Sequence, residues 1–275
     1  MADMITETER LDAAVARRCG FSRAYAKEVI EAGKVFIGGA AKMKPGEKVR
    51  AGIEMTVRDA GMKYVGRGGY KLEKALAAFG VSVENKICID VGASTGGFTD
   101  CMLQKGAARV YAIDAGTAQL SEKLSDDSRV VSMEKTKFQD VGKGEIPDEI
   151  DFIAADIAFS SLSKIMENIA LLLGDAGEAV LLVKPQFEAG KGMVDKKGVV
   201  KDARIHKRVI AAIYSEMKAF GLNPRQLTFS PFKGQDGNIE YLICGKKDAE
   251  VLPEGAFQTL TETVVTDAFA AMKKA

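Results

Sequence analysis

The chain has 275 residues, of which 47% are hydrophobic and 28% are charged, and its formal net charge is +1. This composition is typical of folded globular domains and excludes a disordered or collagen-like chain. No apolar run reaches the roughly 18 residues that a membrane span needs, and the first residues lack the pattern of a signal peptide. We therefore expect a cytoplasmic protein that does not insert into a membrane.

The cysteines and the single histidine are poor candidates for a metal site. Cys19, Cys88, Cys101 and Cys244 lie far apart and form no C-x-x-C pair, and three of them stand in apolar runs. Reduced core thiols are therefore expected, rather than disulfides or zinc ligands. His206 stands in a charged stretch, and we expect it at the surface.

The near-zero net charge conceals segments of opposite sign. Residues 17–50 contain nine basic and three acidic residues, and residues 184–208 contain eight basic and three acidic residues. Residues 114–156 contain five basic and eleven acidic residues. Basic segments of this kind are typical of proteins that bind a polyanion, although a solvated surface gives the same pattern.

The first 57 residues predict two short helices followed by small strands. One amphipathic helix begins at Arg10-Leu11-Asp12, and a second begins at Ser22, a suitable N-cap. Val35–Ile37 is predicted to be a strand that enters a turn at Gly38-Gly39, and residues 49–57 are predicted to be the last strand.

This stretch resembles the S4 RNA-binding domain over residues 8–57. The matching positions are Arg10-Leu11-Asp12, Ser22-Arg23, Ala26, Ile30, Gly33, Val35 and Lys44-Pro45, and the chain departs at Gly38-Gly39, where the family usually has Asn-Gly. The resemblance implies that residues 1–60 form an S4-like α+β unit that binds structured RNA by its backbone and shape. The RNA-binding candidates in this unit are its basic residues on or beside the helices, namely Arg10, Arg17, Arg18, Arg23, Lys27 and Lys34.

Residues 61–69 are predicted to be a linker, and residues 70–275 an α/β domain. Four glycines fall between Arg58 and Gly69, and Arg67 within the linker is a further RNA-binding candidate. Later apolar runs predict strands at 86–91, 109–114, 129–133, 150–156 and 178–184, and helices at 97–105, 117–124, 160–173 and 202–220. This alternation predicts a Rossmann-like parallel sheet with helices on both faces. Two last strands at 225–230 and 239–245 have no helix between them and are expected to pair antiparallel at one edge.

The stretch from Asp90 to Asp100 follows a strand and opens a helix, as cofactor loops of α/β sheets do. Its glycine order is G-x-x-x-G-G-F and not the G-x-G-x-x-G of a dinucleotide site. S-adenosylmethionine is therefore the expected cofactor, a nicotinamide oxidoreductase is disfavoured, and Asp114 is expected to bind the cofactor's ribose hydroxyls. The cofactor-binding candidates are Asp90, Gly92, Ser94, Gly96, Gly97, Phe98, Asp114 and Asp156.

Four polar residues are expected at the same edge of the sheet. Asp156 and Lys184 end parallel strands, Glu240 begins the antiparallel strand, and Lys71 lies on the helix before the first strand. These four residues match the Lys-Asp-Lys-Glu tetrad of the FtsJ-like ribose 2′-O-methyltransferases. Several local strings resemble the TlyA family more narrowly: Lys184-Pro185-Gln186-Phe187-Glu188, Gly190-Lys191-Gly192, Gly198-Val199-Val200 and Gly237-Asn238-Ile239-Glu240-Tyr241.

The resemblance implies an S4 domain joined to a monomeric methyltransferase that acts on cytidine 2′-hydroxyls of 16S or 23S ribosomal RNA, without a metal. Lys184 is the candidate base, because partial burial and repulsion from Lys71 favour a neutral amine, although the neighbouring carboxylates oppose it. Asp156 is expected to align Lys184, while Lys71 and Glu240 position the ribose. Proximity and alignment are expected to supply most of the rate.

Three other segments carry weaker expectations. Residues 189–201, which include Lys191, are rich in glycine and lysine and predict an RNA-contacting lid. Residues 134–137 depart from the Arg-Thr-Asn of similar proteins, so the adenine contacts there are not assigned. An amphipathic helix is expected from Pro253 onward. Two alternatives remain open: a membrane-active cytolysin, suggested by the family's haemolysin label, and a catalytically silent ribosome-binding factor.

Overall fold

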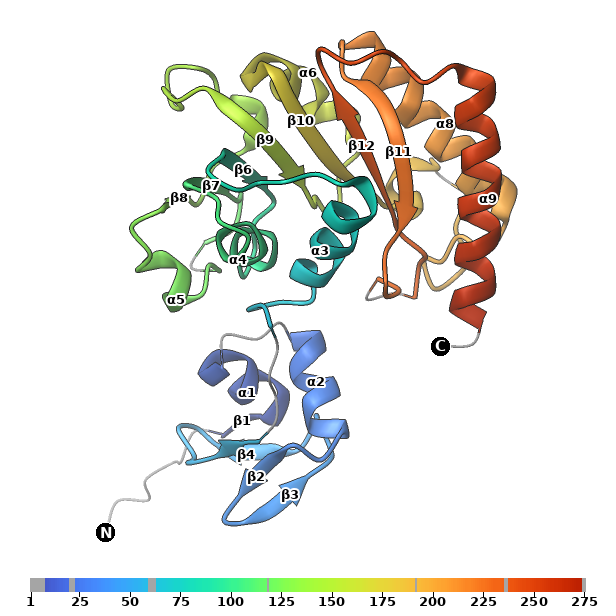
Figure 1. Cartoon of the computed structure of the whole chain (residues 1–275). Coiled ribbons are helices and arrows are strands. Elements are labelled where there is room, and N and C mark those ends of the chain that lie inside the picture. Colours follow the sequence, from blue (N-terminus) through green and yellow to red (C-terminus); the bar gives the residue numbers. More distant parts are fainter. Residues whose placement is uncertain are drawn as a thin grey trace.

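The N-terminal part of the chain forms two helices and two small antiparallel sheets (Figure 1). The computed structural model describes residues 8–19, 23–58, 63–117, 119–190, 192–234 and 237–273. The elements of the N-terminal part are β1 Thr8–Arg10, α1 Leu11–Cys19, α2 Arg23–Glu31, β2 Val35–Ile37, β3 Ala40–Lys42, β4 Lys48–Arg50 and β5 Thr56–Val57. Strand β1 pairs with β4, and β2 pairs with both β3 and β5.

This part has a hydrophobic core of its own. Leu11 and Val15 of α1 are fully buried against Ile30 of α2, and Val35 of β2 completes the contact. These are the positions at which the helical spacing of apolar residues predicts a buried face. The expected cap at Ser22 lies outside the described residues.

The predicted last strand over residues 49–57 is wrong as a single element. Strand β4 ends at Arg50 and β5 begins at Thr56. Between them Gly52 adopts a φ of 74°, a conformation that glycine reaches without steric penalty. The chain turns at this residue, and its two pieces pair in different sheets.

The rest of the chain is built on a seven-stranded sheet. Its strands are β6 Ile87–Val91, β7 Arg109–Ile113, β8 Val130–Met133, β9 Ile150–Ala155, β10 Leu173–Val183, β11 Asn223–Phe229 and β12 Tyr241–Lys246. They lie in the order β11-β12-β10-β9-β6-β7-β8, and the five strands from β10 to β8 are parallel. The α/β prediction is confirmed, with one refinement: the antiparallel strand β12 lies between β10 and the edge strand β11.

Helices cover both faces of this sheet (Figure 1). They are α3 Gly68–Phe79, α4 Gly97–Gln104, α5 Glu122–Ser125, α6 Ser163–Leu172, α7 Pro185–Glu188, α8 Ala203–Ala219 and α9 Glu254–Lys273, with a 3₁₀ turn η1 at Phe138–Asp140. Neighbouring strand residues point to opposite faces, so Cys88 packs with α3 and α4, whereas Ile89 packs with α6, α8 and α9. Burial on both faces explains why the central strands β6, β9 and β12 are mostly apolar.

The predicted helix at 117–124 is wrong in its extent, because among the residues described in this region only Glu122–Ser125 is helical. The Glu134 carboxylate accepts the backbone N–H of Gln119 at 2.8 Å and that of Leu120 at 3.3 Å. These hydrogen bonds hold the segment before α5 against the residue that follows β8.

His206 is fully buried on α8, which contradicts its expected place at the surface. Its Nε2 lies 2.9 Å from the carbonyl oxygen of Val200, and its Nδ1 lies 2.9 Å from the hydroxyl of Tyr241. Burial lowers the pKa of His206, which favours a neutral ring. The histidine thus ties α8 to the residue that follows Glu240.

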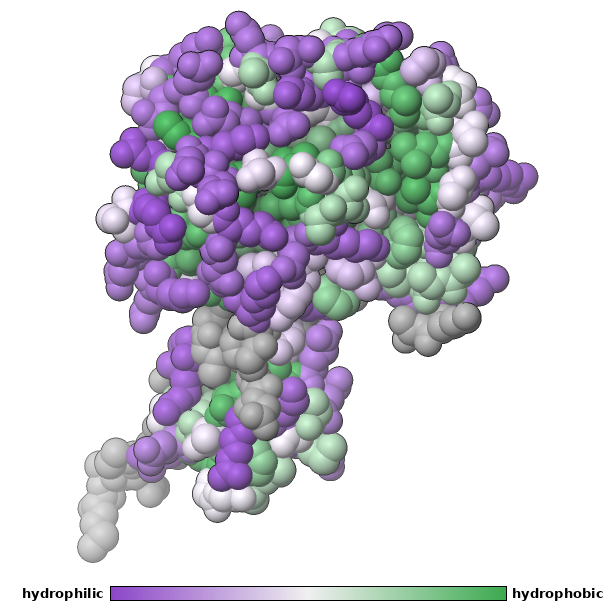
Figure 2. All heavy atoms as spheres, in the orientation of Figure 1, coloured by the Kyte–Doolittle hydropathy of each residue, from purple (hydrophilic) through white to green (hydrophobic). Residues whose placement is uncertain are grey.

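The cysteine prediction agrees with the structure for the three described side chains. Cys88, Cys101 and Cys244 are free thiols in the core, where burial raises the pKa of each to about 12. The helix expected from Pro253 onward is α9, which buries Phe257, Val265 and Ala268. Among the described helices, none has the length and apolar character that crossing a bilayer requires. Figure 2 shows hydrophilic side chains over much of the visible surface.

Candidate active site

Strand β6 holds Asp90 in a fully buried position beside a cavity, just before the turn into α4. Its Oδ2 accepts hydrogen bonds from the backbone N–H of Thr99 at 2.8 Å and from the Thr99 hydroxyl at 2.6 Å. No group of the described residues donates to the other oxygen, Oδ1. Burial raises the pKa of Asp90 to about 7, more than the Thr99 hydrogen bonds lower it. An acceptor of this kind fits the ammonium group at the amino-acid end of S-adenosylmethionine.

The glycines of this turn allow close approaches of the backbone. Gly92 has a φ of 82°, and a Cβ at this residue would lie 2.5 Å from the carbonyl oxygen of Asp156. Gly96, with a φ of 93°, packs against Leu124, and a Cβ on Gly97 would lie 3.0 Å from the backbone nitrogen of Gly69. The loop therefore lies so close to Asp156 and to the start of α3 that a Cβ on these glycines would force a shift of the backbone.

Asp114 lies directly after β7 and holds the same loop from the next strand. Its Oδ2 accepts the N–H of Ser94 at 2.8 Å, and its Oδ1 accepts the N–H of Gly116 at 2.6 Å. Asp114 also lines a second cavity, together with Thr136 and Lys137. This cavity continues from the first along Ser94 and Asp156, so an elongated cofactor can occupy both.

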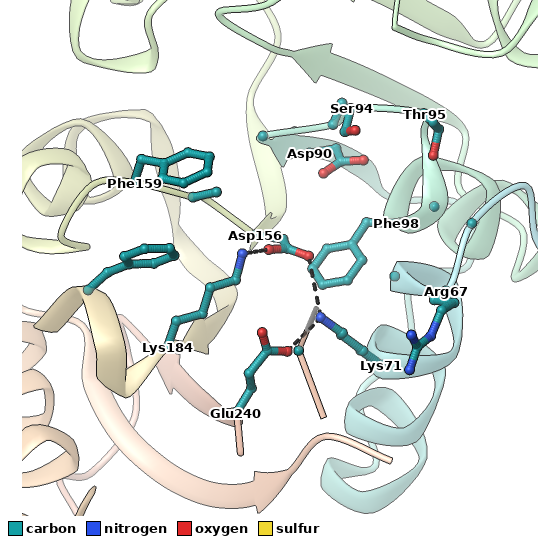
Figure 3. A pocket seen from close by; sticks show the side chains of 18 of the residues that line it. Arg67, Lys71, Asp90, Ser94, Thr95, Phe98, Asp156, Phe159, Lys184 and Glu240 are labelled. Carbon is teal, nitrogen blue, oxygen red and sulfur yellow. Dashed lines mark hydrogen bonds and ion pairs between the residues drawn. The ribbon is translucent and has the colours of Figure 1, made fainter. Parts of the chain in front are cut away.

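The four residues of the predicted tetrad meet in the first cavity, which we call the tetrad pocket (Figure 3). Lys184 Nζ lies 2.5 Å from Asp156 Oδ1, Lys71 Nζ lies 2.6 Å from Glu240 Oε2, and Lys71 Nζ lies 4.0 Å from Asp156 Oδ2. The order along the chain of contacts is Lys184, Asp156, Lys71, Glu240. In Figure 3, Asp156 lies between the loop of Asp90 and Ser94 on one side and Lys71 with Glu240 on the other.

The tetrad charges stabilise one another out of bulk water. Burial opposes the charged form of Lys71, but the carboxylates of Asp156 and Glu240 outweigh it and raise the pKa of Lys71. Burial likewise acts to raise the pKa of Asp156, but the ammonium groups of Lys184 and Lys71 lower it further than burial raises it. Asp156 is thus held as a carboxylate between two lysines.

The predicted RNA-binding residues lie in two places. Arg10 and Arg23 both form ion pairs with the buried carboxylate of Asp12, at 3.0 and 2.9 Å. Arg17 pairs with Glu9, and Arg18 and Lys27 are exposed on α1 and α2. Lys34 is half-buried before β2 and Arg67 lines the tetrad pocket, whereas Lys191 lies outside the described residues.

Several residues of the tetrad pocket were not predicted from the sequence. Phe159 is 91% exposed with a φ of 61°, and its ring centroid lies 5.5 Å from that of Phe187. Lys233 and Gly234, from the loop between β11 and β12, form another part of the wall. Phe159 follows Asp156 by three residues and Phe187 follows Lys184 by three, so closeness to a tetrad residue was the available signal. Among the described residues, no cluster of acidic, cysteine or histidine side chains could hold a metal.

Comparisons with known proteins agree with this geometry. The FtsJ-like methyltransferase family matches residues 64–247. YqxC of Bacillus subtilis is 44% identical over 242 residues, which are 87% of this chain and 86% of YqxC. The 16S/23S rRNA (cytidine-2′-O)-methyltransferase TlyA of Mycobacterium tuberculosis is 39% identical over 85% of this chain and 88% of its own. A solved structure from Streptococcus thermophilus that carries a hemolysin name has 41% identity and a TM-score of 0.81, covering 98% of both chains. The chain therefore belongs to the FtsJ-like methyltransferases and, within them, to the TlyA family.

Proposed function

We propose that this methyltransferase uses S-adenosylmethionine to methylate 2′-hydroxyls of cytidines in 16S or 23S ribosomal RNA. The observation that carries the proposal is the tetrad itself, with Lys184 and Asp156 in contact beside the Asp90 loop. Relatives of this chain that are 30% and 39% identical are named as rRNA (cytidine-2′-O)-methyltransferases. The substrate class follows from this combination of a cofactor site, an amine base and related enzymes.

Bound S-adenosylmethionine supplies an electrophilic methyl group on its sulfonium. The residues of the chain then have to orient a ribose hydroxyl toward that methyl group and accept the proton that the hydroxyl loses. Lys184 is the candidate base, and it accepts the proton once its own proton has left to solvent. Asp156 fixes the position of the Lys184 amine by their contact at 2.5 Å.

Lys71 and Glu240 act on the substrate side of Asp156. Their ion pair at 2.6 Å presents an ammonium donor from α3 and a carboxylate acceptor from the residue directly before β12. A ribose carries hydroxyl groups that both donate and accept, so this pair can orient the sugar. Alignment of this kind supplies a large share of the rate in reactions between two bound molecules.

Residues 1–60 serve, in this proposal, as an S4-like unit that binds ribosomal RNA, with residues 61–69 as the linker to the methyltransferase domain. The exposed cations of α1 and α2 support this role, because phosphate contacts hold RNA without reading its sequence. A ribosomal substrate implies work in the cytoplasm, and we propose that the protein acts there as a monomer.

The test is methyl transfer to RNA from cells that lack the gene. Isolated 30S and 50S subunits, or their rRNA, are incubated with the protein and labelled S-adenosylmethionine, and 2′-O-methyl marks are mapped by primer extension at low dNTP. We expect the protein to add marks at cytidines that are methylated in wild-type cells and unmethylated in cells without the gene. Absence of transfer to both subunits would contradict the proposal.

The hemolysin names of relatives favour a second candidate, a membrane-active protein. Dye-loaded liposomes and erythrocytes separate the two functions. Leakage that is caused by the Lys184→Ala variant and does not depend on S-adenosylmethionine would support the cytolysin. We expect no leakage from the wild type or from this variant.

A further inference from the structure

The loop between β11 and β12 brings Lys233 and Gly234 to the wall of the tetrad pocket. Gly234 lies against Glu240, since a Cβ on Gly234 would be 2.5 Å from Glu240 Oε1. A backbone hydrogen bond of 2.8 Å from Gly234 to Asn238 closes the loop. Lys233 is therefore held next to the carboxylate that pairs with Lys71.

The beginning of α3 holds this loop from the other side. The guanidinium carbon of Arg67 lies 4.9 Å from the centroid of the Phe232 ring, and its Nη2 donates to the carbonyl oxygen of Lys233 at 3.5 Å. The ring of Tyr70 meets Phe232 edge-on at 6.0 Å. Arg67 lines the same pocket and lies beside Lys71 in Figure 3. Two cations from distant segments thus flank the Lys71–Glu240 side of the tetrad.

One of these two cations has no described counter-ion, and the counter-ion of the other is exposed. Inside the tetrad, two lysines already face two carboxylates. Arg67 pairs at 2.9 Å with Glu28, whose side chain is 51% exposed and free to give up this contact. Among the described residues, which omit Gln235 and Asp236, no carboxylate forms an ion pair with Lys233. This wall of the pocket therefore offers Lys233, which has no described ion-pair partner, and Arg67, whose partner Glu28 is exposed.

The substrate supplies an anion at the right place. In RNA, the 2′-hydroxyl and the 3′-phosphodiester are attached to neighbouring carbons of one ribose. A 2′-hydroxyl that reaches Lys184 and Asp156 therefore carries its phosphate to the wall of the same pocket. Lysine and arginine are the side chains that proteins use most for phosphate oxygens.

We propose that Lys233, together with Arg67, binds the 3′-phosphodiester of the nucleotide that is methylated. This inference rests on the proposed function and adds to it a substrate-binding site outside the tetrad. The phosphate replaces Glu28 as the partner of Arg67 and gives Lys233 its counter-ion. It also fixes the ribose at two points, the phosphate and the reacting hydroxyl.

The first experiment measures rRNA binding by Lys233→Ala as a function of salt. We expect affinity to fall about tenfold at low salt. The slope of log Kd against log salt should become shallower by about 0.7–0.9, the value for one phosphate contact. Lys233→Arg should keep the slope, and affinity for S-adenosylmethionine should not change. The matched control is Lys218→Ala, which removes the same charge from the exposed end of α8.

The second experiment identifies the phosphate. An RNA fragment copied from the mapped site carries a neutral methylphosphonate directly 3′ to the target ribose. We expect the wild type to lose about tenfold in methylation rate on this RNA, and Lys233→Ala to lose nothing further. Equal slopes for wild type and Lys233→Ala, or additive losses on the modified RNA, would overturn the inference. Failure of the proposed function is distinguishable, because the wild type would then methylate no ribosomal RNA at all.

Discussion

Two lysine–glutamate pairs of equal length lie in different regions of the molecule. Lys42 Nζ is 2.6 Å from Glu47 Oε1 in the N-terminal part, and Lys71 Nζ is 2.6 Å from Glu240 Oε2 in the tetrad. The side chains of the first pair are 27% and 33% exposed, whereas those of the second are 11% and 3% exposed. Water and salt screen the first pair much more than the second, so equal distances do not mean equal interactions.

In the proposed function, this difference matches two separate tasks, RNA binding and methyl transfer. Exposed cations such as those of α1 and α2 can exchange a carboxylate or water for an RNA phosphate at little loss of free energy. The tetrad charges cannot separate without leaving an unpaired charge in a poorly solvated place. The N-terminal part is therefore suited to adjustable affinity, and the tetrad to a fixed geometry for chemistry.

The largest expected effect is at Lys184, and it tests whether the buried cations act through chemistry or only through charge. Lys184→Ala should leave affinity for S-adenosylmethionine and RNA within a few-fold, yet lower turnover about 10²–10⁴-fold. Lys184→Arg should be no more active than Lys184→Ala, because a guanidinium keeps its proton at any accessible pH. Single-turnover transfer of labelled methyl measures both. Near-normal turnover of Lys184→Arg would show that a fixed positive charge is sufficient.

The two lysine–glutamate pairs provide a direct comparison of stability. Glu240→Gln leaves the Lys71 ammonium with only the more distant Asp156, so we expect the free energy of unfolding to fall by about 2–4 kcal/mol. Glu47→Gln should lower it by less than about 1 kcal/mol. Urea denaturation of both variants beside the wild type gives the two values. Equal losses of unfolding free energy in the two variants would contradict the claim that the tetrad pair is held more strongly than the exposed pair.

The sequence predicted this tetrad because its members occupy recognisable places, at strand ends and on the helix before the first strand. It could not predict Lys233 in the pocket, since that depends on where the β11–β12 loop lies after the sheet has formed. The prediction for His206 was wrong for a related reason. A charged stretch hides the buried stripe of α8, and one partner of the ring, Tyr241, comes from a distant segment. The prediction of one strand over residues 49–57 was wrong because a turn at Gly52 interrupts an alternating apolar pattern.

Asp90 allows a test of the cofactor site, because its pKa is raised to about 7 in the protein without cofactor. If Asp90 binds the ammonium of S-adenosylmethionine as a carboxylate, the complex lowers this pKa and binding releases a proton. Affinity should then be constant above pH 7 and fall as pH decreases, by up to about tenfold per unit. Calorimetric titration from pH 6 to 8 measures the profile, and Asp90→Asn should bind weakly with a flat profile. A flat profile for the wild type would remove Asp90 from the cofactor site.

The raised pKa of Asp90 also sets the sign of its effect on the cofactor-free protein. The pKa is higher in the folded state than the ordinary value near 3.9, so Asp90 contributes its full share of stability below about pH 4. That contribution is lost as pH rises through about 7. S-adenosylmethionine should therefore raise the melting temperature more at pH 8 than at pH 6, whereas Asp90→Asn should show no such difference.

The smallest expected effect is at Arg18, an exposed residue in the last turn of α1 for which no described carboxylate forms an ion pair. Arg18→Ala should raise KM for ribosomal subunits about threefold, leave kcat unchanged, and shift the free energy of unfolding by less than about 0.5 kcal/mol. The rise in KM should shrink as salt increases, because added ions screen exposed charges. A loss of kcat comparable to that of Lys184→Ala would mean that the N-terminal part does more than bind RNA, and that the two regions are not separate in task. A KM unchanged even at low salt would instead remove α1 from the RNA-binding surface.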